Sequence, residues 1–345
     1  MKTNYILSAA ALFLLAVFLG VWLCSILLGQ SLEPEWSDPP MKVEVSVPAE
    51  PEPLPAVESE PSSASETAAG LGSDAEPVIE EEPQPDIRFE LSNDKVYPGD
   101  YIVIRAYNAE ADEIKTVSPF TREPMFFETG DHLSALFPIK YIFEPGEYTV
   151  SIAAGDVSEE FTIELLTKDW QTQHLTVASS TTAATIDNSA ANEEYNIKAH
   201  TKKQLFESAP LWDGNFIQPV EGRITTEFGM QRTVNGVPGD RHGGVDIAAA
   251  RGTPVAAANS GKVIFAEFIA LTGNTVCIEH GMGLKTWYYH MDSLSVSAGE
   301  MVEKGQQIGT IGSTGFSTGP HLHWAAAVFD VYIDPWLLTE SAPAI

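Results

Sequence analysis

The alternation of hydrophobic and polar residues divides the chain into stretches of different character. An uncharged apolar run over residues 6–29 comes first, and a polar, proline-rich stretch over residues 31–86 follows it. From residue 87 onward, short segments rich in β-branched and aromatic residues alternate with turn sequences that contain glycine, proline and aspartate. Such segments are typical of β-strands. The pattern therefore predicts a mainly β protein behind an apolar N-terminal segment.

The first β-rich region, residues 87–167, contains predicted strands in IRFEL, YIVIRAY, ALFPIKYIF, EYTVSIAA and EEFTIELL. The turn sequences YPGD, EPGE and AGDVS separate several of them. Tyr148, Val150 and Ile152 are alternate positions, so their side chains share one face of a strand. We expect a small antiparallel, β-sandwich-like accessory domain without a catalytic role.

The second β-rich region, residues 213–340, is expected to form a separate domain. Its predicted strands are RITTEFG, TPVAAA, GKVIFAEFI, NTVCIEH, KTWYYHM, QQIGTIG and HLHWAAAVF, with glycine frequent at the turns. No helix-length amphipathic repeat occurs there. Residues 168–212 are expected to connect the two domains through a strand in HLTVASS and a helix in NEEYNIKAHTKKQLF, with Asn192 as the N-cap.

The apolar run predicts a transmembrane helix within residues 1–30. At about 1.5 Å per residue, residues 6–29 can cross a hydrocarbon core of about 30 Å. Lys2 precedes the run and acidic residues follow it, which predicts a cytoplasmic N-terminus. We therefore expect a single-pass protein of the cell membrane with extracytoplasmic C-terminal domains. The alternative is a cleaved signal peptide and a secreted protein, although no A-x-A-like cleavage site follows.

Residues 31–86 are predicted to be a disordered linker, because this acidic, proline-rich composition cannot bury enough apolar surface to offset its ordering entropy. Lys42 is the sole basic residue in this stretch, and the net charge of the chain is −29. So acidic a chain argues against nucleic acid as a partner. The two cysteines, Cys24 and Cys277, lie in segments that are not expected to meet, so no disulfide is predicted.

Five of the eight histidines fall within residues 242–323, in a pattern that suggests metal chemistry. In His321-Leu-His323, residues i and i+2 of a strand point to one groove, so one imidazole can bind a metal ion while the other transfers protons. In His242-Gly-Gly-Val-Asp246, a glycine turn can bring both side chains to one ion. These donors suit Zn²⁺, and three protein ligands leave a position open for water.

These motifs resemble those of the lysostaphin-like zinc metallopeptidases, which hydrolyse peptide bonds in peptidoglycan. The similarity runs from about Phe216 to Pro335 and rests on ITTEFGMQR, RHGGVDIAAARGTPVAAANSGKV, GNTVCIEHGMGLKTWYYHM and VEKGQQIGTIGSTGFSTGPHLHW. It implies a compact antiparallel β fold with a groove across a sheet, and cleavage of cross-links or stem peptides in cell-wall remodelling. More loosely, the accessory domain resembles the β domain that precedes the peptidase in many membrane-bound members.

The resemblance also implies the roles of individual residues. Zn²⁺ ligands are expected at His242, Asp246 and His323, and the two non-ligand histidines of the active site at His290 and His321. His321 is then expected to accept a proton from the attacking water, and His290 to stabilise the oxyanion or protonate the leaving amine; these two roles are exchangeable. The loop QRTVNGVPGDR lacks a tyrosine that assists the oxyanion in some members, which concerns the rate more than the reaction.

Two other functions use the same features. Some family members have lost a zinc ligand and act as scaffolds, so a non-hydrolytic extracytoplasmic scaffold or regulator is the alternative. A metallopeptidase that acts on proteins is a third hypothesis. The intact ligand set favours the wall endopeptidase.

The sequence also suggests roles for several residues outside this set. His280 is expected to be structural, and Arg241 to steady the metal loop. The loop GSTGFSTGP either lets a peptide backbone approach closely or forms a tight connection. Five aromatic side chains either line the groove or pack in the core: Trp287, Tyr288, Tyr289, Phe316 and Trp324.

Overall fold

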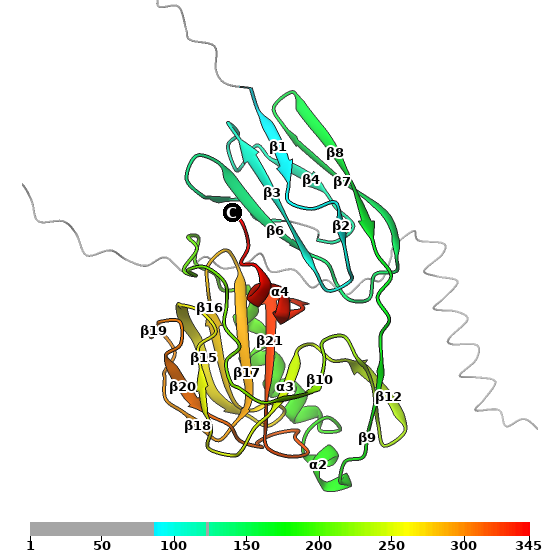
Figure 1. Ribbon diagram of the computed structural model, residues 1–345, viewed down its shortest axis with the longest axis vertical. Helices are drawn as coiled ribbons and strands as arrows, with labels where there is room; N and C mark the ends of the chain where they lie inside the picture. Colours follow the sequence, from blue (N-terminus) through cyan, green and yellow to red (C-terminus); the bar gives the residue numbers. More distant parts are fainter. Residues whose placement is uncertain (1–85, 122–123) are drawn as a thin grey trace, which may run out of the picture. The chain divides into compact units, whose positions relative to one another are not determined.

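The computed structural model describes residues 86–121 and 124–345, and these residues are mainly β, as predicted (Figure 1). The expected membrane anchor lies outside the described residues, as does the expected linker apart from Asp86. Within the described part of the chain, no helix is both long enough and apolar enough to span a membrane.

Two four-stranded sheets are formed by residues 88–165, in the orders β1–β3–β6–β5 and β2–β8–β7–β4. Ile102 and Ile104 of the first sheet and Val150 and Ile152 of the second are buried in one shared core. The strands are Arg88–Leu91 (β1), Lys95–Val96 (β2), Tyr101–Tyr107 (β3), Lys115–Val117 (β4), Phe127–Glu128 (β5), Leu133–Pro138 (β6), Gly146–Ala154 (β7) and Val157–Leu165 (β8). The short β2 departs from the expected antiparallel arrangement, because it pairs with β8 in parallel.

An eight-stranded sheet in the C-terminal region has the order β10–β13–β21–β17–β16–β15–β19, with β22 also paired to β21. Its strands are Arg223–Thr226 (β10), Val245–Ala248 (β13), Gly261–Ile269 (β15), Gly273–Glu279 (β16), Leu284–Met291 (β17), Met301–Val302 (β19), His321–Val328 (β21) and Val331–Ile333 (β22). The neighbouring strands of this sheet pair antiparallel, which is the expected arrangement.

The middle strands of this sheet are covered on both faces, so every residue of β17 is buried. On one face lies a three-stranded sheet of Pro254–Ala256 (β14), Gln307–Thr310 (β20) and Ser293–Leu294 (β18). Val255 and Ile308 of that small sheet share a core with Val276 and Trp324 of the large one. Burial on both faces explains why these strands are near-continuous apolar runs in the sequence.

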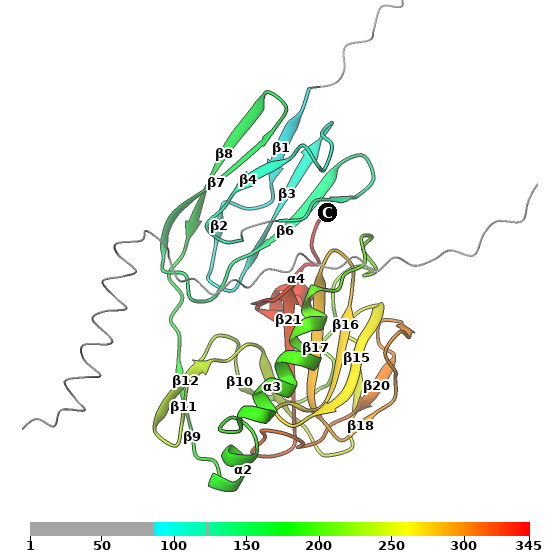
Figure 2. The same cartoon turned by 180° about the vertical axis from the view of Figure 1, so that it is seen from behind.

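On the other face, the large sheet packs against a helix from the connecting segment (Figure 2). Helix α3 spans Ser189–Lys198, and the 3₁₀-helix η1, His200–Gln204, follows it. Tyr195 and Ala199 contact a cluster that contains Cys277 and Trp287, where the cysteine is buried and forms no disulfide with any described residue.

The helix begins earlier than predicted. Its N-cap is Asn188, whose side chain accepts hydrogen bonds from the amides of Ala190 and Ala191. The expected cap, Asn192, lies inside the helix, and its side-chain amide donates to the carbonyl of Asn188 instead. Both asparagines are plausible caps by residue type, and the earlier one is used because Ser189 and the alanines after it also adopt helix.

Part of the connecting segment joins the C-terminal region. Strand β9, Thr172–Leu175, pairs in parallel with β11, Gln231–Val234, which in turn pairs with β12, Val237–Arg241 (Figure 2). The strand expected in HLTVASS therefore lies earlier, and the residues after Leu175 lead into the short helix α2, Ser179–Ala184. A last short helix, α4 (Pro335–Glu340), is too brief to give an amphipathic repeat in the sequence.

Candidate metal centre and catalytic cleft

The register of two neighbouring strands brings the first two candidate ligands together. Asp246 of β13 lies directly opposite His323 of β21, so their side chains share one face of the sheet. His321 lies two residues before His323 and therefore faces the same side. His242 comes from the turn between β12 and β13, where its backbone amide donates to the carbonyl of Met230. Residues far apart in the sequence thus converge on one point.

Three side-chain atoms face one another at this point. His242 Nε2 and His323 Nδ1 lie 2.9 Å and 2.8 Å from Asp246 Oδ1, and 2.8 Å from each other. His242 Nδ1–H donates to the carbonyl of Glu227, so Nε2 of the neutral ring carries a lone pair. A lone pair directed at a carboxylate oxygen and a second imidazole favours a cation between them. The cluster could therefore hold a metal ion.

Close packing requires a glycine in the turn between the candidate ligands His242 and Asp246. A Cβ atom on Gly244 would lie 2.5 Å from the carbonyl oxygen of Trp324 and 2.8 Å from His323 Nε2. A side chain at Gly244 would therefore displace a metal ligand. Gly243 is less constrained, because a Cβ atom there would meet its nearest neighbour, a ring carbon of Tyr332, at 3.4 Å.

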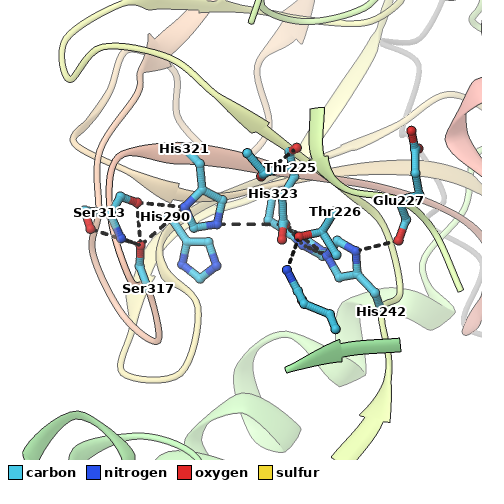
Figure 3. A network of polar contacts seen from close by, with 12 residues as sticks. Thr225, Thr226, Glu227, His242, His290, Ser313, Ser317, His321 and His323 are labelled. Carbon is cyan, nitrogen blue, oxygen red and sulfur yellow. Dashed lines mark hydrogen bonds and ion pairs between the residues drawn. The ribbon is translucent and has the colours of Figure 1, made fainter. Parts of the chain in front are cut away.

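His290 and His321 lie beside the ligand cluster, with the ligand His242 on the far side of His323 (Figure 3). His321 Nδ1–H donates to the carbonyl of Gly319, and His290 Nδ1–H donates to that of Thr314, both at 2.8 Å. Each neutral ring therefore carries its lone pair on Nε2. His321 Nε2 is 3.8 Å from Asp246 Oδ1, so one proton acceptor adjoins the metal ligands directly.

A β-bulge directs His290 toward the cleft. The pairing of β16 with β17 slips between Val276, which faces Tyr288, and Asn274, which faces Met291, so β17 contains one extra residue there. His290 itself has a φ of 64°, in the left-handed region that is uncommon for residues other than glycine. Bulges of this kind redirect a side chain, and strained residues concentrate at functional sites.

The electrostatic environment keeps Asp246 charged and the His323 and His290 rings neutral. Burial alone would raise the pKa of Asp246, but His242 and His323 outweigh it and hold that pKa well below its usual range. Burial lowers the pKa of His323 to about 4. Burial, assisted by His321 and His323, lowers the pKa of His290 to about 3. A carboxylate and neutral imidazoles are the forms that bind a metal ion.

The site opens into a cleft with a volume of about 290 Å³. The loop GSTGFSTGP lines one side through residues 316–320. Phe316 alone of the five aromatic candidates is among the lining residues. Trp287, Tyr288 and Trp324 are fully buried in the core, and Tyr289 stacks on the ring of His323 with centroids 5.1 Å apart.

His280 is buried between the Ser260 carbonyl and the Thr286 hydroxyl, each 2.7 Å away, so its contacts are structural, as expected. Arg241 donates to the carbonyl of Gly229, whose amide in turn donates to the carbonyl of His242. The contact of Arg241 with the metal loop is therefore made through the backbone.

A second arginine contacts a candidate ligand directly. Arg232 donates from Nη2 to Asp246 Oδ2 at 2.8 Å. Arg232 is absent from the site residues predicted above, although it ends the stretch ITTEFGMQR, and that position within a recognisable motif was its only signal.

Comparison with known proteins finds a family match over the part of the chain that contains the three candidate ligands. Residues 240–335 match the model of peptidase family M23. The chain is 35% identical over 158 residues to the peptidoglycan DD-endopeptidase ShyC of Vibrio cholerae, covering 45% of this chain and 34% of that protein. It is 39% identical over 130 residues to the DD-carboxypeptidase/endopeptidase Mpg of Neisseria meningitidis, covering 37% and 30%. The chain thus spans about a third of the length of these relatives.

Among solved structures, the catalytic domain of lysostaphin from Staphylococcus simulans is 34% identical in sequence. The match covers 35% of this chain and 93% of that domain, with a TM-score of 0.32.

We predict that Gly244→Ala and Gly243→Ala differ sharply, because a methyl group clashes with backbone at the first position and makes ordinary contact at the second. Gly244→Ala should lower the free energy of unfolding by about 1–3 kcal/mol and reduce bound metal. Gly243→Ala should cost about 1 kcal/mol or less. Urea unfolding and metal analysis measure both effects, and equal behaviour of the two variants would contradict the steric argument.

We also predict that variants of the ligand histidines lose bound metal, whereas variants of the non-ligand histidines keep it. His323→Ala removes one of three donors and should abolish near-stoichiometric metal binding, whereas His290→Ala should retain it. Elemental analysis of the purified variants, matched for folding by circular dichroism, makes the comparison. Full metal content in folded His323→Ala would remove His323 from the ligand set.

Proposed function

Because this chain belongs to peptidase family M23 through residues 240–335, we propose that it is a zinc-dependent endopeptidase that hydrolyses peptide bonds in peptidoglycan. The observation that carries the proposal is the convergence of three metal donors and two further imidazoles at one cleft. A structural metal site has no need of two additional histidines with free lone pairs beside it. A hydrolytic site needs groups that accept and return protons.

Zinc is the metal that this donor set fits. Two imidazole nitrogens and one carboxylate oxygen are ligands that suit Zn²⁺, and catalytic zinc sites commonly have three protein ligands. His242, Asp246 and His323 would hold the ion. When bound, zinc would polarise the scissile carbonyl and lower the pKa of the attacking water.

The two remaining histidines provide the proton transfers. His321 accepts the proton of the attacking water at Nε2, the atom nearest to the ligand Asp246. The Gly319 carbonyl holds the ring for this role, because it fixes the proton on Nδ1. His290, fixed in the same way by Thr314, stabilises the oxyanion or returns a proton to the leaving amine. The two roles can be exchanged without changing the net reaction.

Peptidoglycan is proposed as the substrate from the named activity of the similar protein ShyC, which is a peptidoglycan DD-endopeptidase. The substrate is then a cross-link or a stem peptide.

We further propose that the chain is attached to the cell membrane by the apolar segment 6–29 and carries its enzyme domain outside the membrane.

We predict that the full chain releases new amino groups from purified peptidoglycan and that a chelator stops this release. Added zinc should restore it. His321→Ala and His290→Ala should each lower the rate by about 10²–10⁴-fold while zinc remains bound, because each removes an acid–base group. Labelling of new amino termini, with mass spectrometry of the fragments, measures the activity and names the bond.

Zinc-loaded chain that binds peptidoglycan without releasing amino groups would favour the non-hydrolytic scaffold instead. Release that persists at full rate in both histidine variants would overturn the assigned roles.

A further inference from the structure

A strand from outside the family-matched residues forms part of the cleft wall. Strand β9 belongs to the connecting segment, well before residue 240, yet Gln173 and Leu175 line the cleft together with Asp246 and His323. Their neighbours on the strand, Thr172 and His174, are exposed. The alternation is that of a strand with one face on the cleft and one on solvent.

Gln173 uses both ends of its side-chain amide. Its Oε1 accepts a hydrogen bond from Arg232 Nε at 3.1 Å, and its Nε2 donates to Thr226 Oγ1 at 2.7 Å. Arginine can only donate, so this contact fixes which end of the amide is the oxygen. The residue is therefore held in one orientation between β11 and β10.

Arg232 connects Gln173 to the candidate metal ligand Asp246. Its Nη2 donates to Asp246 Oδ2, while Asp246 Oδ1 faces His242 and His323. The exposed fractions of the two side chains are 22% for Arg232 and 9% for Asp246, so solvent screens the ion pair only in part. With Oδ2 engaged by the guanidinium, the carboxylate presents a single oxygen to the ligand cluster.

We infer that Gln173 is a positioning residue of the metal centre, which acts through Arg232 to hold Asp246 in its ligating orientation. The inference rests on the proposed function and adds that the connecting strand β9 is part of the catalytic unit. Outer partners of metal ligands commonly contribute about 10–100-fold to metal affinity. Gln173 lies 59 residues before Arg232 in the sequence. Because both residues precede residue 240, this support for the metal centre comes from outside the matched family region.

The test measures zinc affinity of the full chain by competition with a chromophoric chelator, and kcat/KM on purified peptidoglycan in parallel. Arg232→Ala should weaken zinc binding by about 10–100-fold, and Gln173→Ala by about tenfold. The double variant should match Arg232→Ala alone, because Gln173 acts through that residue. Gln173→Glu, which keeps an acceptor for Arg232, should restore affinity to within about threefold of the original chain.

His174→Ala is the matched control, since it removes the contact with Thr233 on the solvent face of the same strand. It should leave zinc affinity unchanged. Loss of thermal stability in Gln173→Ala with unchanged zinc affinity would overturn the inference and make the residue merely structural. Additive effects of Gln173→Ala and Arg232→Ala would also overturn it. If the original chain binds no zinc, the proposed function fails as well, whereas normal zinc binding and cleavage in Gln173→Ala refute the inference alone.

Discussion

The candidate metal centre depends on one register, in which Asp246 of β13 lies opposite His323 of β21. A slip of one residue would turn one of these side chains to the other face of the sheet and separate the donors. The neighbouring strand β17 holds β21 in this position. It is buried along its whole length and pairs with β21 over six residue pairs, from Leu284 to Tyr289. The buried apolar strands therefore set the site as well as the stability of the fold.

A second layer of contacts decides how each functional side chain is used. Carbonyl groups of Glu227, Gly319 and Thr314 fix the protons on His242, His321 and His290. In all three neutral rings the lone pair is then on Nε2, and in His242 and His321 this is the nitrogen that faces Asp246. Metal ligands and catalytic bases need this state, and the backbone provides it without any further side chain. Asp246 differs, because its outer partner is the side chain of Arg232.

Much of the fold could be predicted from local patterns, and the strand bounds at 101–107 and 261–269 agree with the predicted segments residue by residue. The candidate ligands could be found because the histidine and aspartate spacings indicate a metal site, while the resemblance to a known family assigned His323, and not His321, to the ligand set. The role of Arg232 could not, because it depends on a pairing across the fold. The start of the helix at Asn188 could not be predicted, because Asn192 is an equally suitable N-cap by residue type. The bulge next to His290 could not be predicted either, because residue types alone do not indicate it.

If the proposed function is correct, His242, Asp246 and His323 bind one zinc ion. The most direct measurement is anomalous diffraction from crystals of the purified full chain, recorded on both sides of the zinc absorption edge. We expect one strong peak at about 2.0–2.2 Å from His242 Nε2, Asp246 Oδ1 and His323 Nδ1, present only above the edge. A zinc-saturated crystal with no peak among these three atoms, or with the peak at other residues, would contradict the claim.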